Sequence, residues 1–389
     1  MRRLVALDLP GGPEFTTALR RILDDGDAAL PLDVRLPTAA RRRLLGALAP
    51  CAVRDASGET PLSGGRPVEE GDALVLATSG TTGEAKGVVL THDAVAASAA
   101  ATSERLGVDP GSDAWLCCLP LAHVGGLSVV LRAWHAGTGL EVHPRFRVAD
   151  ALGAAARGAT LVSLVPTMLR RLGAGAAAFR AIVLGGAAPP GDLPPNVVTT
   201  YGLTETGSGL VYDGWPLAGV EVRTRDGEVL VRGPMLLRAY RDGTVPFDAD
   251  GFFHTGDAGA LSADGRLVVH GRMTEMIVSG GENVWPVAVE AVLETVPGVS
   301  EVAVGGVADP EWGQRVVAYV VPVPGEALPR LAALRDQVRA EIGPWAAPRE
   351  LVLVDHLPRT ALGKVRRHAL AALKGPDDAH DGAQRSGET

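Results

Sequence analysis

The sequence has little cysteine, no excess of positive charge and no long uninterrupted apolar run. Only Cys51, Cys117 and Cys118 occur among its 389 residues, and their spacing fits neither a metal site nor a redox pair. Such scarcity is typical of a reducing compartment, so we expect a cytoplasmic protein with buried thiols. With 45 acidic against 37 basic residues, the formal net charge of -8 disfavours general binding to nucleic acid. A small-molecule ligand is the better hypothesis.

The apolar segments are too short or too interrupted to predict membrane insertion. The N-terminal "MRRLVALDLPGG" reaches charge and Pro-Gly-Gly before a signal-length apolar core forms. The most apolar later stretch, Leu116 to Trp134, contains Pro120, His123 and Arg132. A membrane-spanning helix seldom carries these three residues together. We therefore expect neither a signal peptide nor a membrane span.

Alternation of short apolar runs with alanine-rich stretches predicts an α/β fold. "ALVLATSG" precedes "AVAASAAATSERLG", and "TLVSLVP" precedes "TMLRRLGAGAAAF". These pairs favour parallel sheets with covering helices. From Gly219 to Val269 the segments are short and broken by Asp-Gly and Arg-Gly, which predicts a small hairpin-rich β region.

A compact β/α pattern follows "HGRMTEMIVSGG" and includes a helix near Leu331 to Ile342. We therefore expect two domains, a large N-terminal one over residues 1–273 and a smaller α+β one over residues 274–374. Residues 375–389 lack apolar content and are expected to be a disordered tail.

The stretch "ATSGTTGEAKGVVLTH", Ala77 to His92, combines hydroxyls, glycines and a lysine, which are suited to binding phosphate. It is not a Walker loop, because a β-like run follows Lys86 and no hydroxyl comes directly after the lysine. A loop between two strands can instead surround a triphosphate with its hydroxyls, its amides and the ammonium of Lys86. The alternative is a polar hairpin without a ligand.

Five ordered segments resemble the adenylate-forming superfamily of acyl-CoA and aryl-CoA synthetases, adenylation domains and luciferases. They are "TSGTTGEAKG", "YGLTETG", "HTGD", "GRMTEMIVSGGENVWPVAVE" and "PRTALGKVRR". Within that superfamily, "LPLAHVGGLSVVLRAWHAGTGLEV", "SLVPTMLRRL", "IVLGGAAPP" and "SGLVYDG" are most similar to short actinobacterial o-succinylbenzoate–CoA ligases. The similarity covers about residues 71–370. It implies ATP, Mg²⁺ and the co-substrate CoA.

The resemblance assigns a set of residues to the nucleotide. Those expected around the triphosphate are Thr78, Ser79, Gly80, Thr81, Thr82, Gly83 and Lys86. Those expected around the adenosine and α-phosphate are Gly185, Gly186, Tyr201, Gly202, Thr204, Asp257, Arg272, Gly280 and Gly281. Asp257 would accept hydrogen bonds from both ribose hydroxyls, with Arg272 supporting it. Glu205 would bind Mg²⁺ as a hard oxygen ligand.

Two further residues carry catalytic roles by the same resemblance. Lys364 matches the family lysine that reaches the substrate carboxylate and the α-phosphate, although a solvated surface lysine is the alternative. His123 would border the acid pocket, with Gly125 and Gly126 leaving room for an aromatic ring. A buried structural histidine is its alternative. Together with Thr204 and Glu205, these two residues form the predicted catalytic set. Three residues are expected to line the same pocket, Ser163, Pro166 and Thr167.

Two features depart from the family pattern. The hinge usually carries Asp or Lys where this chain has Thr274, so we expect domain alternation with an uncertain hinge residue. Only 77 residues precede Thr78, fewer than in most relatives. We expect part of an N-terminal subdomain to be missing.

The favoured function is that of an ATP-dependent o-succinylbenzoate–CoA ligase of menaquinone biosynthesis. A homodimer is the candidate assembly. The alternatives are another aryl- or medium-chain acyl-CoA ligase, a carrier-loading adenylation enzyme, and a non-catalytic nucleotide-binding protein. The second carboxylate of o-succinylbenzoate needs a cationic or multiply hydrogen-bonded anchor. Arg132 is a candidate for that anchor, and an exposed arginine at a helix end is the alternative.

Overall fold

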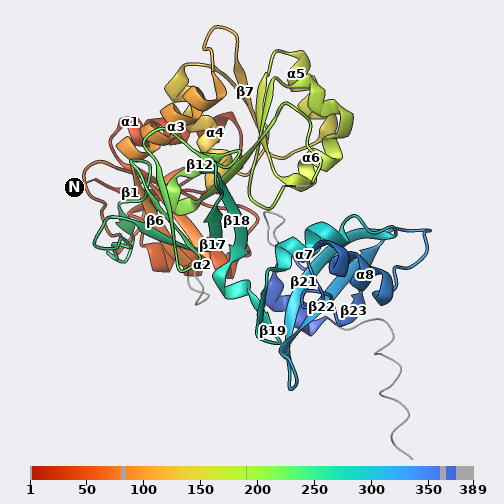
Figure 1. The fold of residues 1–389 in the computed structure, drawn as a ribbon. Coiled ribbons are helices and arrows are strands. Elements are labelled where there is room, and N and C mark those ends of the chain that lie inside the picture. The colour runs from red at the N-terminus through yellow and green to blue at the C-terminus, as the bar shows by residue number, and fades with distance from the viewer. Residues whose placement is uncertain (1, 80–84, 190, 360–364, 374–389) are drawn as a thin grey trace, which may run out of the picture. The chain divides into compact units, whose positions relative to one another are not determined.

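The computed structural model describes residues 2–79, 85–189, 191–359 and 365–373. The chain divides into two compact units. The first contains residues 1–223, 230–254 and 261–267, and the second contains residues 224–229, 255–260 and 268–389. Figure 1 colours the chain from red at its N-terminus to blue.

The first sheet of the larger unit has parallel strands at its centre and antiparallel strands at its edges. Its strand order is β16-β6-β5-β2-β1-β3-β4. Its strands are β1 (Leu4–Leu7), β2 (Ala28–Pro31), β3 (Ala52–Asp55), β4 (Gly58–Pro61), β5 (Asp72–Ser79), β6 (Ala85–Thr91) and β16 (Ala239–Tyr240). Strands β3, β1, β2 and β5 are parallel, whereas β4, β6 and β16 are antiparallel to their neighbours.

Two helices pack on this sheet. Helix α1 (Pro13–Asp24) begins with a proline. Proline is tolerated there because the first N–H groups of a helix have no partner within the helix. Its buried residues Phe15, Ala18, Leu19 and Ile22 are three or four positions apart and share one face. Helix α2 (Thr38–Leu48) buries Leu44 and Leu48. Strands β1 and β2 are buried along their whole length, as expected for parallel strands with covering helices.

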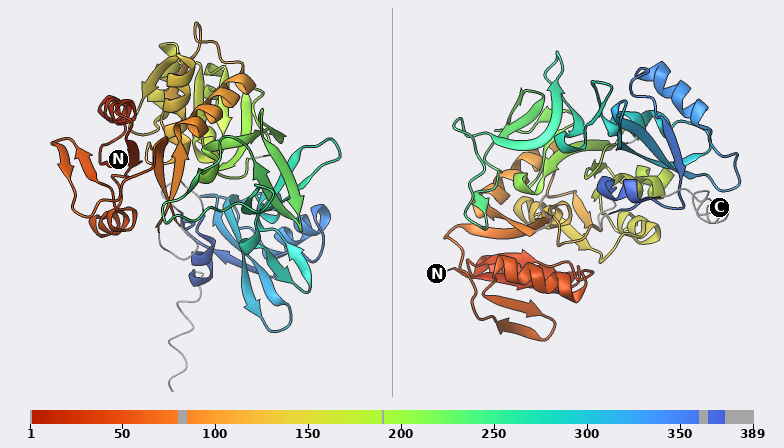
Figure 2. Two further views of the ribbon diagram at one scale, coloured as in Figure 1. Left: turned by 90° about the vertical axis from the view of Figure 1, so that its left-hand side faces the viewer. Right: turned by 90° about the horizontal axis from the view of Figure 1, so that it is seen from below.

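The second sheet of the larger unit has the order β13-β12-β11-β10-β9-β7-β8. Its strands are β7 (Ala114–Cys117), β8 (Gly139–Val142), β9 (Leu161–Leu164), β10 (Ala181–Leu184), β11 (Val197–Leu203), β12 (Ser208–Tyr212) and β13 (Trp215–Pro216). Strands β8, β7, β9, β10 and β11 are parallel, whereas β12 and β13 are antiparallel to their neighbours. Figure 2 shows the red-to-orange and yellow-to-green strands as separate layers.

Helices α3 (His92–Leu106) and α4 (Val124–Ala136) lie side by side and connect the two sheets (Figure 1). Helix α3 contacts β5 and β6 of the first sheet and β12 of the second. Helix α4 contacts β7, β9 and β12 of the second sheet. Thr91 caps α3 by accepting a hydrogen bond from the Ala94 amide, 3.1 Å away.

The alanine-rich segment after β9 forms less helix than its composition predicts. Helix α5 (Val148–Ala156) precedes β9, and α6 (Pro166–Leu172) follows it. The sequence predicted one helix through Phe179, but α6 ends before Gly173, whose φ of 54° is left-handed. Residues Gly173–Ala178 continue as a 3-10 turn, η1.

The hairpin-rich region expected from the sequence forms a small sheet of order β14-β15-β17-β18. Its strands are β14 (Glu221–Arg225), β15 (Glu228–Arg232), β17 (Phe253–Leu261) and β18 (Leu267–Arg272). Asp226 and Gly227 join β14 to β15 with φ values of 52° and 78°. Two positive φ values are typical of a type I′ turn, for which Asp-Gly is a preferred pair.

The C-terminal part of the second unit has a sheet of order β20-β19-β22-β21, with β23 beside β22. Its elements are β19 (Ile277–Ser279), β20 (Glu282–Val284), α7 (Pro286–Leu293), β21 (Val299–Asp309), β22 (Gly313–Pro322), α8 (Leu331–Glu341) and β23 (Glu350–Leu353). Helices α7 and α8 pack with one sheet face around Val289, Val304 and Leu334. A 3-10 turn, η4 (Arg367–Ala372), contributes Leu370 to a second core. No helix in the described ranges is long and apolar enough to cross a membrane.

Candidate active site

The predicted phosphate loop lies at the end of a β-hairpin. Strand β5 ends at Ser79, β6 begins at Ala85, and the antiparallel register pairs Thr78 with Lys86. Thr78 Oγ1 lies 3.4 Å from the carbonyl oxygen of Lys86. The flanking strands therefore differ from the strand-to-helix geometry of a Walker loop. The predicted loop residues Gly80, Thr81, Thr82 and Gly83 lie outside the described residues.

A tyrosine that the sequence reasoning missed connects the loop lysine to the predicted magnesium ligand. Lys86 Nζ lies 5.1 Å from the centroid of the Tyr240 ring. The Tyr240 hydroxyl donates a hydrogen bond to Glu205 Oε1 at 3.1 Å. Because β16 pairs with β6, Tyr240 lies opposite Val88, two residues after Lys86. The three side chains thus place an ammonium, a hydroxyl and a carboxylate in one row.

Thr204 and Glu205 lie in a 3-10 turn, η2 (Thr204–Thr206), between β11 and β12. The Thr206 hydroxyl accepts a hydrogen bond from the Leu203 amide at 2.9 Å. It also lies 2.6 Å from the Ser208 carbonyl oxygen, to which it donates. These bonds fix the backbone of the turn. The side chains of Thr204 and Glu205 remain partly exposed, as ligand-binding groups must be.

The predicted adenine-binding residues gather at the carboxyl ends of β10 and β11. Gly185 and Gly186 follow β10, which is parallel to β11 and in register with it up to Thr199. A Cβ on Gly185 would lie 2.6 Å from Thr200 Oγ1, and Gly186 has a φ of 87°. Both positions therefore require glycine. Carboxyl ends of parallel strands are a common place for ligands in α/β proteins.

Tyr201 and Gly202 lie near the end of β11, where its pairing with β12 is irregular. A Cβ on Gly202 would lie 2.1 Å from the Ser208 carbonyl oxygen. No side chain fits in that gap, because real Cβ contacts are not this short. The Gly in this motif thus has a packing role in the strand pair, in addition to its predicted proximity to the nucleotide.

Asp257 and Arg272 form an ion pair in the second unit. Arg272 Nε lies 3.0 Å from Asp257 Oδ1, and Arg272 also donates to the Thr255 carbonyl oxygen at 2.8 Å. Asp257 is 7% exposed. The guanidinium therefore orients the carboxylate, as expected of a residue that supports it. The role of Asp257 toward ribose stays a prediction.

Gly280 and Gly281 turn the chain between β19 and β20 with φ values of 61° and 86°. Gly280 packs on Trp312, because a Cβ there would lie 2.8 Å from the indole. Arg349 also lies over the ring of Trp312, with its guanidinium carbon 3.5 Å from the ring centroid. The glycine pair is thus part of a fixed turn in the second unit.

His123 lies at the N-terminus of α4, and its backbone is held by the turn that precedes the helix. Its carbonyl oxygen accepts hydrogen bonds from the amides of Gly126 and Leu127 at 3.1 and 3.0 Å. A Cβ on Gly126 would lie 2.5 Å from the Pro120 carbonyl oxygen, whereas one on Gly125 would meet only Leu119 at 3.7 Å. Gly126 is therefore required for close packing of this turn. Only Gly125 is consistent with the predicted role of leaving room.

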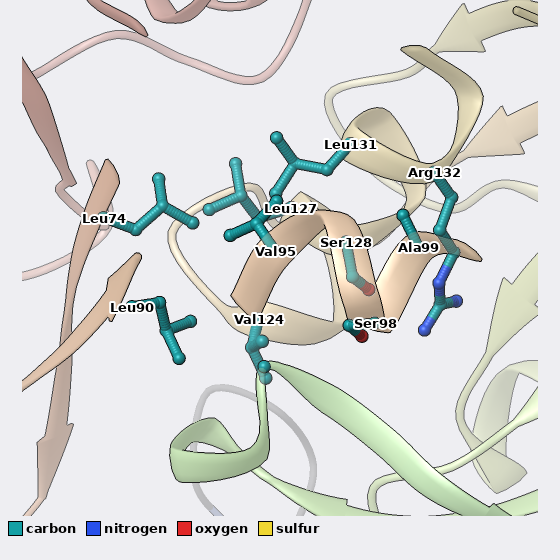
Figure 3. A pocket seen from close by; sticks show the side chains of 11 residues that line it. Leu74, Leu90, Val95, Ser98, Ala99, Val124, Leu127, Ser128, Leu131 and Arg132 are labelled. Carbon is teal, nitrogen blue, oxygen red and sulfur yellow. The ribbon is translucent and has the colours of Figure 1, made fainter. Parts of the chain in front are cut away.

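A narrow cavity lies between α3, α4, the start of β5 and the end of β6 (Figure 3). Leu74, Val95 and Leu127 form apolar walls, and Ser128 and Arg132 contribute polar groups. Its volume of about 10 Å³ is roughly that of one water molecule. Ser163, Pro166 and Thr167 do not line this cavity, so their assignment to an acid pocket stays a prediction.

Arg132 is buried, so the exposed-arginine alternative is wrong. Its exposed fraction is 2%, and it lies within α4 two turns after His123. One terminal nitrogen donates to Ser208 Oγ at 2.5 Å, and the guanidinium lies 5.9 Å from the Trp115 ring centroid. Its Nε has no hydrogen-bond partner in the described part of the chain. No carboxylate there forms an ion pair with it.

The larger unit contains the ends of the phosphate loop, Lys86, Tyr201 to Glu205, the Gly185–Gly186 pair and His123. Asp257, Arg272, Gly280 and Gly281 belong to the second unit. Lys364 and the tail 375–389 lie outside the described residues.

The chain belongs to the AMP-binding enzyme family. The model of that family matches residues 54–241, and the model of the AMP-binding enzyme C-terminal domain matches residues 288–364. These matches confirm the predicted superfamily and the α/β fold with a C-terminal α+β part.

Particular relatives are ligases of one kind. A probable 2-succinylbenzoate–CoA ligase of Mycobacterium tuberculosis is 40% identical over 94% of this chain and 97% of its own length. The o-succinylbenzoate CoA synthetase of Bacillus subtilis in complex with the acyl-adenylate intermediate OSB-AMP has a TM-score of 0.84 and 29% identity. That match covers 96% of this chain and 90% of that one. The same enzyme in complex with ATP and magnesium ion has a TM-score of 0.82 at 29% identity, covering 95% and 90%.

Proposed function

We propose that this chain is an AMP-forming acid–CoA ligase that activates o-succinylbenzoate and transfers it to CoA. In the first half-reaction a carboxylate oxygen attacks the α-phosphorus of ATP, and pyrophosphate leaves. In the second, the CoA thiol loses its proton and attacks the acyl carbon, and AMP leaves. The product is a thioester. Relatives that carry this activity in their names support the proposal.

The larger unit offers groups that fit ATP and Mg²⁺. Lys86 would supply a cation for the outer phosphates, and the predicted phosphate loop is expected to supply amides. Glu205 supplies one carboxylate, which suffices because Mg²⁺ in nucleotide sites keeps several waters and takes other ligands from phosphate. The ion would neutralise charge on the departing pyrophosphate. Tyr240 holds Glu205 in place through its 3.1 Å hydrogen bond.

Two further residues complete the proposal. Lys364 would bind the attacking carboxylate and the α-phosphate in the first transition state. Asp257, oriented by Arg272, would accept hydrogen bonds from the ribose hydroxyls. We keep the division into domains 1–273 and 274–374, with Thr274 as the candidate hinge. A cytoplasmic location in menaquinone synthesis agrees with the scarcity of cysteine. A homodimer stays a prediction.

The substrate proposal depends on one observation, the buried guanidinium of Arg132. A charged group that is 2% exposed is costly to bury unless an opposite charge or several hydrogen bonds compensate it. In the described residues Arg132 has one hydroxyl partner and an unpaired Nε. An anionic ligand would supply the missing charge. The distal carboxylate of o-succinylbenzoate is such a ligand, whereas a monocarboxylate has no second charge to offer.

The cavity beside Arg132 is too small for an aromatic acid, so binding requires its side chains to move. Its walls include Val95 of α3 and Leu127 and Leu131 of α4 (Figure 3). Rotation of such side chains is within the ordinary range of binding-site adjustment. The aromatic ring would take the apolar walls and the distal carboxylate would reach Arg132.

A panel of acids tests the function. The purified protein is incubated with ATP, Mg²⁺, CoA and each acid, and pyrophosphate and CoA-thioester are measured separately. We expect both products with o-succinylbenzoate at a rate well above that for benzoate or octanoate. Pyrophosphate without thioester would favour a carrier-loading enzyme instead. Absence of both products with every acid would reject a ligase.

A further inference from the structure

An aspartate far from His123 in the sequence lies beside its imidazole. Asp33 follows β2, and its Oδ2 lies 3.5 Å from His123 Nε2. The Nε2 atom is buried and makes no hydrogen bond within the described ranges. At 3.5 Å the contact is longer than a normal N–H···O hydrogen bond and is an electrostatic one.

Arg35 holds the Asp33 carboxylate in position. Its Nε and one terminal nitrogen donate to the two carboxylate oxygens at 2.8 and 2.7 Å. The Arg35 backbone amide donates to Oδ1 at 3.0 Å. These hydrogen bonds lower the pKa of Asp33, even though its burial acts in the opposite direction. Asp33 is therefore an ionised, fixed acceptor at neutral pH.

Hydrogen bonds and close packing also hold the backbone of His123. The α4 N-terminus anchors its carbonyl group, and Gly126 packs against the preceding turn. Burial is the largest effect on the pKa of His123 and lowers it, and the Arg35 charge also lowers it. Asp33 raises it. A neutral imidazole that carries its proton on Nε2 can donate to Asp33 and expose Nδ1 as an acceptor.

We propose that Asp33 is a positioning residue for His123, fixing the orientation and the tautomer of its imidazole at the N-terminus of α4. This inference rests on the proposed function, because His123 precedes Val124, which lines the cavity assigned to the acid. Asp33 acts through His123 and does not touch the substrate. Arg35 keeps the carboxylate ionised and aimed at the ring.

A double-mutant cycle with Asp33→Asn and His123→Ala tests the proposal. Adenylate formation is measured as pyrophosphate release, and thioester formation is measured from supplied acyl-adenylate and CoA. In the half-reaction that His123→Ala slows most, we expect Asp33→Asn to reduce the rate about 10-fold, since a misplaced group loses catalytic geometry. In the His123→Ala background Asp33→Asn should change that rate less than twofold. Equal losses in both backgrounds, or no loss from His123→Ala, would overturn the proposal.

A second measurement needs no substrate and therefore separates this proposal from the ligase assignment. Histidine is isotopically labelled, and the His123 signal is identified by its loss in His123→Gln and titrated by NMR. Asp33→Asn removes the carboxylate that raises the pKa of His123, so that pKa should fall. Arg35→Gln removes a repelling charge, so it should rise. Shifts in the same direction, or no shift, would refute the arrangement even if the protein makes the thioester.

Asp113→Asn is the matched control, because Asp113 is also buried and held by two hydrogen bonds from one arginine, Arg180. Within the described residues its hydrogen bonds and ion pair join it to Asp109, Thr160 and Arg180, none of which is a predicted site residue. We expect it to leave the His123 pKa and both half-reactions unchanged. An equal effect of Asp113→Asn and Asp33→Asn would show general destabilisation and would reject a positioning role.

Discussion

Within the larger unit, the segments predicted to bind the nucleotide and the cavity proposed for the acid are built differently. The nucleotide residues come in short runs, such as Tyr201 to Glu205, that follow strand ends and stay partly exposed. The cavity residues come from β5, β6, α3 and α4 and are mostly buried. A run of neighbours can surround a phosphate with hydroxyls and amides, because a loop presents them together. An acid pocket is instead a gap between packed helices, and its chemistry depends on which side chains meet there.

Removing the charge of Lys364 should have the largest effect. We expect Lys364→Ala to slow adenylate formation by ~10²–10³, because the lysine is assigned to the first transition state. Thioester formation from supplied acyl-adenylate should be spared. Stopped-flow measurement of each half-reaction checks this, and equal loss in both would reject the assignment.

Gly126→Ala tests the packing of the turn before α4, the helix that lines the cavity. Its Cβ would lie 2.5 Å from the Pro120 carbonyl oxygen, so we expect a loss of about 1–3 kcal/mol in unfolding free energy. Gly125→Ala is the matched control, since its nearest atom lies at 3.7 Å. Thermal or denaturant unfolding measures both. Equal destabilisation by the two variants would contradict the described turn.

Removing the hydroxyls of the phosphate loop tests the segments predicted to bind the nucleotide. With Thr81 and Thr82 both replaced by alanine, ATP and pyrophosphate should bind about 10-fold more weakly, since two hydrogen bonds to charged oxygens are lost. AMP should bind nearly as before, because it lacks the outer phosphates. Calorimetry with the three ligands is the measurement. A matching loss of AMP affinity would show that the loop has another role.

Tyr240→Phe should give the smallest effect. It removes one 3.1 Å hydrogen bond to Glu205 while keeping the ring near Lys86. A net hydrogen bond of about 0.5–1.5 kcal/mol corresponds to roughly a 2- to 13-fold rise in the KM for MgATP. The KM for the acid should not change. A change in the acid KM alone would place Tyr240 in a different site.

The segments predicted to bind the nucleotide could be picked out in the sequence because their residues are neighbours along the chain. The loop flanks form a hairpin end, Thr204 and Glu205 lie in the η2 turn, and Asp257 pairs with Arg272, while the roles of these residues toward the nucleotide stay predictions. Tyr240 and Asp33 were missed, since each acts on a partner 35 or more residues away and only the folded sheets bring them together. The sequence contains only a weak indication that Arg132 is buried. It lies in an apolar helix, four residues after Ser128 and therefore on the same face as that small side chain. The early end of α6 at Gly173 was missed because helix propensity was weighed above a left-handed glycine.

The most direct test of the account compares acid specificity in the wild-type protein and in Arg132→Gln. The kcat/KM for o-succinylbenzoate is divided by that for benzoate in each protein, in the same coupled thioester assay. We expect the wild-type ratio to be high and Arg132→Gln to reduce it about 10- to 100-fold, because a hydrogen-bonded charge pair is lost only with the dicarboxylate. The kcat/KM for benzoate should stay nearly constant. An unchanged ratio, or a wild-type protein that prefers the monocarboxylate, would contradict the assignment of Arg132 as the anion anchor.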